Sequence, residues 1–248
     1  MSDTPLRRLL HRSASLLPDA LRCRLRDALG LANPEATMRR MKACGFAPGT
    51  IVDVGAYVGA WTTLCKRVFP AAKVLMIEPQ PGCAGSLDRV CRSLPGVERL
   101  QALLGATEHP AVPFHENRSA SSVLDEAERD APPSLVLPAT TLDVATDGTA
   151  FARPDFIKLD VQGYELEVLK GGDRALGAAE AALLEVNLIE VYRGAPLFDE
   201  VVSFMGGRGL RLYDICGLMR RPYDGSLWQM DAVFVRATSP LVASRRWA

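Results

Sequence analysis

The sequence predicts an α/β protein with a mostly parallel sheet, one antiparallel strand near the C-terminus and helices on both faces. Three observations predict this fold. Short apolar runs alternate with segments of helical periodicity from residue 50 onward. Four of these runs end in an acid, at Asp53, Glu78, Asp160 and Glu185. The last two apolar runs are joined by a loop short enough to make them antiparallel neighbours.

Three segments are expected along the chain. Residues 1–37 form an N-terminal helical extension, residues 38–238 the α/β domain and residues 239–248 a C-terminal tail. Leucines spaced among the arginines of the extension predict an amphipathic helix that packs on the domain, with contact to a membrane surface or a partner as the alternative. Asn33-Pro34-Glu35 predicts the start of a second helix, with Asn33 as its cap.

The elements of the domain follow in order from local patterns. Apolar and β-branched runs predict strands over 50–54, 73–77, 97–104, 155–163, 181–186, 210–215 and 232–236, and helices are expected over 61–67, 82–94, 164–170 and 196–207. The alternation breaks between residues 105 and 150. There, short strands over 111–115 and 135–142 flank a Ser/Asn-rich loop, in a connection whose length is typical of lids and binding loops.

Composition narrows the class of protein. The 248 residues are 48% hydrophobic and fit one sizeable domain plus an extension. The formal net charge of zero argues against a nucleic-acid partner held by bulk electrostatics. The six cysteines include no C-x-x-C pair and have no histidines at zinc spacing, which favours reduced thiols in a cytoplasmic protein. No apolar run approaches ~18 residues, so no transmembrane helix is expected.

The end of the first strand predicts a cofactor site. Asp53 begins the pattern D-x-G-x-x-x-G, whose glycines let the backbone pass close to a ligand. The acid at its front would repel a pyrophosphate, and the dinucleotide fingerprint G-x-G-x-x-G is absent. Glu78, after the second strand, is placed to accept both hydroxyls of a ribose. S-adenosylmethionine suits this site because it carries an ammonium, a sulfonium and a ribose but no phosphate, and Asp53 is expected to reach its cationic head group. The expected cofactor-binding residues are Asp53, Gly55, Ala56, Tyr57, Gly59, Glu78, Pro79 and Leu103.

The remaining strand-end acids predict the catalytic side. Lys158 and Asp160 share one face of their strand because side chains alternate with a period of two. Asp160 is predicted to take the proton of an acceptor hydroxyl, with Lys158 keeping it ionised and Glu185 beside it. His115 is the substitute base if the 105–150 segment folds over the site. The alternative for Lys158 and Asp160 is a buried ion pair, and Glu185 is more often a structural acid.

A metal offers a rival chemistry at the same place. Asp160 and Glu185, with Glu165 or Asn187, are hard oxygen ligands that suit a magnesium ion able to acidify a bound hydroxyl. Lys158 nearby would compete with the cation, so magnesium is not favoured.

With these residues placed, the chain resembles FkbM-type S-adenosylmethionine-dependent methyltransferases from about residue 38 to residue 236. The most distinctive block is Ile157-Lys158-Leu159-Asp160-Val161-Gln162-Gly163-Tyr164-Glu165, and ordered blocks precede and follow it. The resemblance implies a class I methyltransferase (Rossmann-like) fold and O-methylation of a hydroxyl on a sugar, glycan or secondary metabolite. Tyr57 stands where the family more often has Asn, and Gln162 where many members have Glu.

Other classes of function remain as alternatives. A non-catalytic, cofactor-binding scaffold of a biosynthetic complex is consistent with the two departures from the family pattern. An NAD-type oxidoreductase is disfavoured by the missing fingerprint. A nucleic-acid methyltransferase is disfavoured because no Asn/Asp-Pro-Pro-aromatic block is present to hold a flipped base.

Overall fold

A seven-stranded sheet forms the centre of the structure, a computed structural model that describes residues 32–127, 132–244 and 246–247. Its strands are β1 (Thr50–Val54), β2 (Lys73–Ile77), β3 (Val97–Leu100), β7 (Phe156–Leu159), β8 (Ala181–Asn187), β9 (Leu210–Arg220) and β10 (Leu227–Arg236). They lie in the order β3-β2-β1-β7-β8-β10-β9. Within this sheet, β10 runs in the direction opposite to that of the other six strands. The predicted fold, with one antiparallel strand near the C-terminus, is confirmed.

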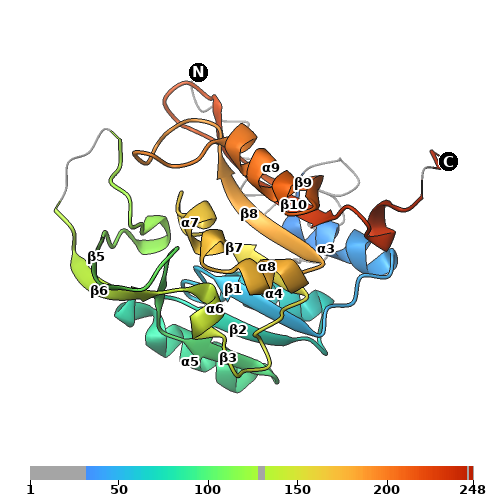
Figure 1. Cartoon of the computed structure of the whole chain (residues 1–248), viewed down its shortest axis with the longest axis horizontal. Coiled ribbons are helices and arrows are strands. Elements are labelled where there is room, and N and C mark those ends of the chain that lie inside the picture. Colours follow the sequence, from blue (N-terminus) through green and yellow to red (C-terminus); the bar gives the residue numbers. More distant parts are fainter. Residues whose placement is uncertain (1–31, 128–131, 245, 248) are drawn as a thin grey trace, which may run out of the picture.

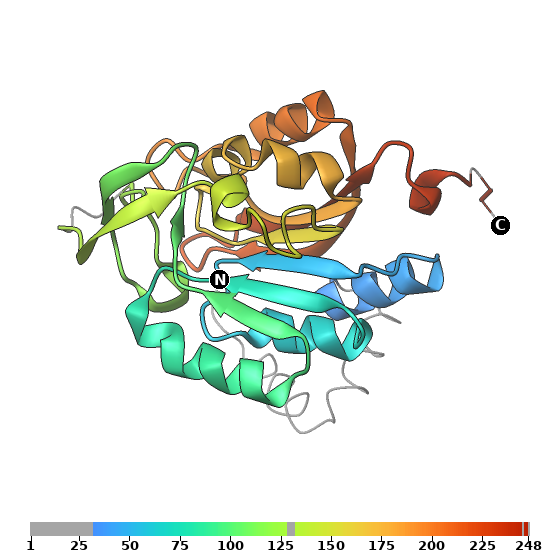
Figure 2. The ribbon, with the colours of Figure 1, turned by 60° about the horizontal axis from the view of Figure 1, so that its bottom comes forward.

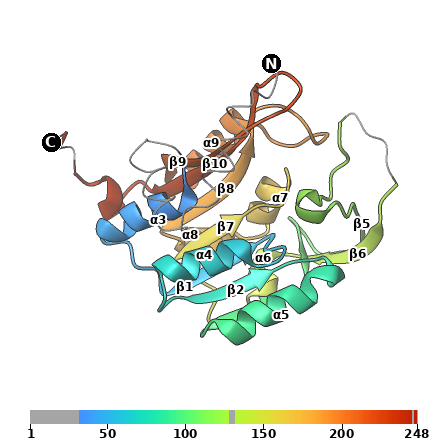
Figure 3. The same ribbon diagram turned by 180° about the vertical axis from the view of Figure 1, so that it is seen from behind.

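Helices cover both faces of the sheet. On one face lie α3 (Pro34–Ala43), α4 (Ala60–Val68) and α5 (Ala84–Ser93); on the other lie α6 (Leu142–Ala145), α7 (Glu165–Lys170), α8 (Asp173–Ala178) and α9 (Phe198–Gly207) (Figures 1 and 3). The alternation of side chains along each strand produces the two cores. On β1, Ile51 packs in the cluster with α3 and α4, whereas Val52 packs in the cluster with α7 and α9.

Helix α3 begins where the sequence predicts. Asn33 Oδ1 accepts a hydrogen bond from the N–H of Glu35 at 3.0 Å, which caps the helix. The domain boundary expected after residue 37 falls inside this helix, and Thr37 Oγ1 donates to Asp214 Oδ2 of β9 at 2.8 Å. Helix α3 therefore packs as part of the sheet domain. The rest of the expected N-terminal extension, residues 1–31, lies outside the described residues.

The strand expected over 97–104 is two strands in two sheets. The chain leaves the large sheet after β3, and β4 (Leu103–Leu104) joins β5 (His109–Phe114) and β6 (Leu135–Thr140) in a small sheet of order β4-β6-β5. The prediction of a single strand is wrong because Leu103 and Leu104 pair with β6 instead of continuing beside β2. Figure 2 shows the small sheet beside one end of the large one.

The cysteines and the helix lengths concern two further predictions from the sequence, reduced thiols and the lack of a transmembrane helix. Cys44, Cys65, Cys83, Cys91 and Cys216 are free thiols, and Cys65, Cys83 and Cys216 are buried. Within the described ranges, no helix has both the length and the apolar character needed to span a bilayer.

Candidate active site

A cavity opens at the carboxyl ends of β1, β2 and β7, where the small sheet meets the large one. Together with its open mouth it holds about 510 Å³ of empty space. We call it the cofactor cavity. The expected cofactor-binding residues that line it are Gly55, Tyr57, Glu78, Pro79 and Leu103. Ala56 and Gly59 belong to the same turn without lining the cavity.

The turn after β1 requires glycine because it packs against the end of β7. Gly55 has a φ of +73°, and a Cβ atom there would lie 1.8 Å from the carbonyl oxygen of Asp160. Tyr57 also adopts a left-handed conformation, with a φ of +49°. Its N–H donates to Glu78 Oε2 at 2.7 Å, and this bond holds the turn against β2.

Glu78 is buried at the wall of the cofactor cavity, with 3% of its surface exposed. Its Oε1 accepts hydrogen bonds from the backbone N–H and the side-chain Nε2 of Gln80, both at 3.0 Å. Burial raises the pKa of Glu78, while the hydrogen bonds from Gln80 and Tyr57 oppose that shift. A carboxylate offers about four acceptor sites, and these three bonds leave room for one ribose hydroxyl on Oε2 instead of the two expected from the sequence. The residue therefore fits a nucleoside.

Asp53 does not reach the cofactor cavity, contrary to the expectation of a direct contact with a cationic head group. Its side chain lies on the α4 face of the sheet and is fully buried. Thr62 Oγ1 of α4 donates to Asp53 Oδ2 at 2.6 Å, and Lys158 Nζ lies 3.3 Å from Oδ1. The two-residue period explains this placement: Asp53 points to the same face as Ile51.

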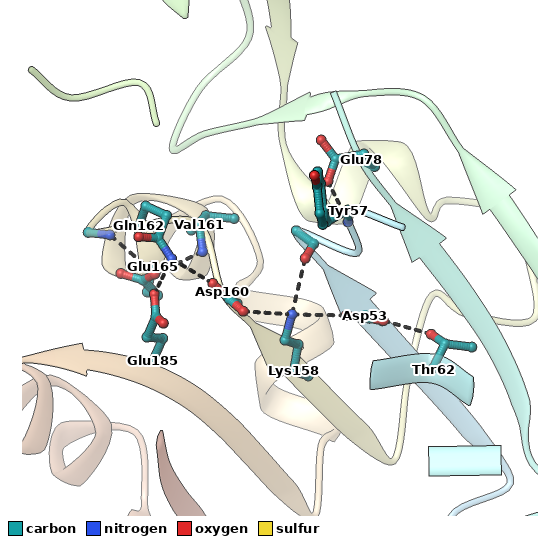
Figure 4. Close-up of polar contacts among 12 residues, drawn as sticks. Asp53, Tyr57, Thr62, Glu78, Lys158, Asp160, Val161, Gln162, Glu165 and Glu185 are labelled. Carbon is teal, nitrogen blue, oxygen red and sulfur yellow. Dashed lines mark hydrogen bonds and ion pairs between the residues drawn. The ribbon is translucent and has the colours of Figure 1, made fainter. Parts of the chain in front are cut away.

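Lys158 links the strand ends that form the site (Figure 4). Its Nζ lies 3.3 Å from Asp160 Oδ2 as well as from Asp53, and it donates to the carbonyl oxygen of Gly55 at 3.1 Å. Burial lowers the pKa of Lys158, but the charges of Asp160, Asp53 and Glu185 outweigh burial and raise it. Lys158 is therefore a cation that positions Asp160 and the glycine turn together. The predicted pairing of Lys158 with Asp160 is confirmed.

Gln162 joins Asp160 to Glu185. Its Nε2 donates to Asp160 Oδ1 at 2.9 Å and to Glu185 Oε2, and its Oε1 accepts a hydrogen bond from the hydroxyl of Tyr192 at 2.9 Å. Gln162 has a φ of +56°, a strained conformation for a residue with a Cβ atom. Burial raises the pKa of Glu185 well above its ordinary value, and the charge of Asp160 adds to the shift. Glu185 therefore favours its protonated form.

A second cavity lies beyond Asp160, between β8, β9 and β10. It holds about 730 Å³ of empty space including its open mouth, and Asp160 and Glu185 line it. We call it the outer cavity. Asp160 lines both the cofactor cavity and the outer cavity, and about a third of its side chain is exposed. It stands in the wall that separates them.

The alternative base and the metal ligands have other partners. His115 Nε2 lies 3.1 Å from Asp125 Oδ1 and lines neither of the two cavities. Glu165 Oε1 accepts hydrogen bonds from the backbone N–H groups of Val161 and Gly163, at 2.9 and 3.3 Å. In the part of the chain that the structure describes, no three or more His, Cys, Asp or Glu side chains are arranged to hold a metal ion.

Sequence patterns did not identify several residues of the cofactor cavity. They are Gln80, Phe114, Arg118, Val123 and Tyr164. Arg118 and Val123 lie in or beside the Ser/Asn-rich loop, in a connection whose length predicted a lid or binding loop without singling out a side chain. Gln80 lies two residues after Glu78, and this closeness to a strand-end acid is the signal that could have identified it.

Comparisons with known proteins show what this chain is similar to. Residues 53–212 match the family model described as the methyltransferase FkbM domain. "Methyltransferase sdnD" of Sordaria araneosa is 30% identical over 155 residues, covering 50% of this chain and 60% of the relative. "Hexuronic acid methyltransferase AglP" of Haloferax volcanii is 26% identical over 136 residues, covering 54% of each chain. The chain thus spans little more than half the length of these curated relatives.

Among solved structures, a similar one is magnesium protoporphyrin IX methyltransferase (ChlM) of Synechocystis PCC 6803 with bound SAM. It has a TM-score of 0.47 and 14% identity, covering 86% of this chain and 79% of that one. The family model matches more than half of the sequence and takes in Asp53, Glu78, Asp160 and Glu185. The chain belongs to the FkbM methyltransferase family.

Proposed function

We propose that this protein transfers a methyl group from S-adenosylmethionine to a hydroxyl group of a sugar, a glycan or a secondary metabolite. The observation that carries the proposal is the position of Asp160 between the cofactor cavity and the outer cavity, held by Lys158. Family membership supports methyl transfer. The relative named as a hexuronic acid methyltransferase supports a sugar-like acceptor.

The cofactor cavity suits S-adenosylmethionine. Glu78 would accept a hydrogen bond from a ribose hydroxyl, and Leu103 and Pro79 would supply apolar surface for the adenine ring. The glycine turn lets the backbone approach the ligand closely. When bound, the cofactor would supply a methyl group on a sulfonium, which departs as a neutral thioether. Asp53 would not touch the cofactor; it would act indirectly, by holding Lys158 in place.

The protein's own task is to orient the acceptor and take its proton. An alcohol is a weak acid, so a base must accept the hydroxyl proton as the oxygen bonds to the methyl carbon. Asp160 would receive that proton on its carboxylate. Lys158 contacts Oδ2 and Gln162 contacts Oδ1, so the carboxylate keeps one orientation. The outer cavity would hold the acceptor on the far side of Asp160.

An Asp160→Asn variant tests the role of the base. Methyl transfer, followed as release of S-adenosylhomocysteine with a panel of hydroxylated acceptors, should fall by ~10²–10⁴-fold. Affinity for S-adenosylmethionine, measured by calorimetry, should stay within about threefold because Asn keeps the size of the side chain. Asp199→Asn is the matched control, since Asp199 is an exposed acid of α9 outside both cavities. Unchanged turnover in Asp160→Asn would contradict the proposal.

Chelation tests the rival chemistry in the same assay. With a side-chain base, turnover should not respond to EDTA. Loss of turnover that magnesium restores would instead indicate that a metal ion acidifies the acceptor.

A further inference from the structure

The outer cavity has an unusual balance of charge. Three of its lining residues are acids, Asp160, Glu185 and Asp231, and no Lys, Arg or His of the described residues lines it. The nearest cation of the site, Lys158, is already shared between Asp53 and Asp160. Because Glu185 favours its protonated form, the negative charge that a ligand meets in this cavity comes from Asp160 and Asp231.

Asp231 owes its position to an irregularity in the sheet. The register of β9 and β10 shifts between Asp231 and Ala232, which face Gly217 and Ile215, so Cys216 is an extra residue on β9. Such bulges re-aim side chains and are frequent next to active sites. A Cβ atom on Gly217 would lie 1.9 Å from Asp231 Oδ2. The bulge and the glycine together make room for this carboxylate.

Among the described residues, the carboxylate oxygens of Asp231 and the side-chain oxygen of Gln229 have no hydrogen-bond partner. Within the described residues, the Asp231 carboxylate has no hydrogen bond or ion pair, although burial and the charge of Asp160 raise its pKa to about 6. Gln229, only 2% exposed, also lines the cavity. Its Nε2 makes one long bond of 3.5 Å to Asn187, and its Oε1 has no partner among the described residues. Both residues line the cavity, so a ligand that donates hydrogen bonds would satisfy these acceptors.

We infer that the outer cavity binds the methyl acceptor and selects against negative charge, so that the acceptor is an uncharged or amine-bearing polyhydroxyl compound. This inference rests on the proposed function. Hydroxyl and ammonium groups donate to carboxylates and to the Gln229 oxygen, whereas a carboxylated or phosphorylated acceptor would place like charges side by side. The chain would thus differ from its relative named for hexuronic acid, and Asp231 would be a specificity-determining residue.

The test is a charge series on one sugar ring. Methyl glucoside, methyl glucosaminide and methyl glucuronoside are titrated into the full chain by calorimetry, with and without saturating S-adenosylhomocysteine. The first two should bind at least about tenfold more tightly than the glucuronoside, because like-charge contacts cost several kcal/mol. Asp231→Asn should reduce this difference in affinity to about threefold or less, because it relieves the repulsion of the glucuronoside. Asp199→Asn, which removes an exposed acid elsewhere, should leave it unchanged.

Gly217→Ala provides a second variant that keeps the charge but displaces it, because the new Cβ atom would collide with Asp231. Gly217→Ala should also reduce the difference in affinity between the glucuronoside and the other two glycosides. Equal binding of the three glycosides, preference for the glucuronoside, or no binding of any of them would overturn the inference. Failure of the cofactor proposal would appear separately, as absent binding of S-adenosylhomocysteine in the same samples.

Discussion

Asp53 and Lys158 are direct cross-strand partners in the middle of the sheet. The register of β1 and β7 places them opposite each other, with Nζ 3.3 Å from Oδ1. Asp53 is fully buried and Lys158 is 4% exposed. The acid of the glycine-rich motif therefore acts on the site through a lysine, and that lysine in turn contacts Asp160. The first residue of the D-x-G-x-x-x-G motif, expected to contact the cofactor, instead pairs with the lysine that positions Asp160.

Replacing Lys158 with Met should destabilise the fold strongly. The substitution leaves Asp53 buried without its counter-charge, and breaking a buried pair in this way costs about 3–5 kcal/mol. Urea unfolding followed by circular dichroism measures the change. The double variant Asp53→Asn, Lys158→Met should recover part of the loss, since it leaves no lone buried charge. If the double variant is as unstable as the sum of the two single ones, the pair is not coupled.

Replacing Glu78 with Gln should weaken binding of S-adenosylmethionine by ~10–100-fold. Hydrogen bonds to a charged group contribute about 1.5–3 kcal/mol, and the new amide would also turn a donor toward the N–H groups of Tyr57 or Gln80. Calorimetric titration measures the affinity, with NAD as a second ligand that should not bind. Glu98→Gln, an exposed acid of β3, is the control. Equal affinity in Glu78→Gln and the wild type would exclude Glu78 from the ribose site.

The fold could be predicted from sequence because its signals are local. Apolar runs, glycine turns and the cap at Asn33 each depend on a few neighbouring residues, and they located the strands of the large sheet and the start of α3. The split of 97–104 was missed because pairing of Leu103 with β6 is a long-range choice that an apolar run does not encode.

The site was predicted less completely for the same reason. Strand-end acids identified Glu78, Asp160 and Glu185, and the two-residue period paired Lys158 with Asp160. Whether Asp53 faces a cavity or the core depends on α4, which covers that face of β1. Asp231 was missed as a site residue, although an acid inside the apolar run of β10 is a signal that could have found it.

Glu165 should make stability depend on pH. Burial raises its pKa from 4.5 to about 7, and the charge of Asp160 raises it as well. The backbone hydrogen bonds from Val161 and Gly163 act in the opposite direction and lower the pKa. Between pH 4.5 and 7 the unfolded chain loses this proton while the native state keeps it. The native state is therefore penalised as pH rises through this window, by up to about 3 kcal/mol above pH 7.

The Glu165→Gln variant isolates that contribution. Gln does not ionise but keeps an oxygen for the two N–H groups, so its stability relative to the wild type should rise between pH 4.5 and 7. Urea unfolding at pH 4.5, 6 and 7.5 measures the difference. Glu167→Gln, on the exposed side of α7, should show no such trend. A constant difference between Glu165→Gln and the wild type would show that Glu165 ionises normally in the folded protein.

Gln162 should determine how the site responds to pH. Its amide donates to Asp160 and Glu185, so Gln162→Glu would bring a third carboxyl group against two others. Adjacent carboxyls share protons and repel when ionised. Turnover of the variant relative to the wild type should therefore fall as pH rises from 6 to 8. Tyr192→Phe is the control, because it removes only the hydroxyl that orients the amide and should cost a modest factor at every pH. Parallel pH profiles for Gln162→Glu and the wild type would contradict this arrangement.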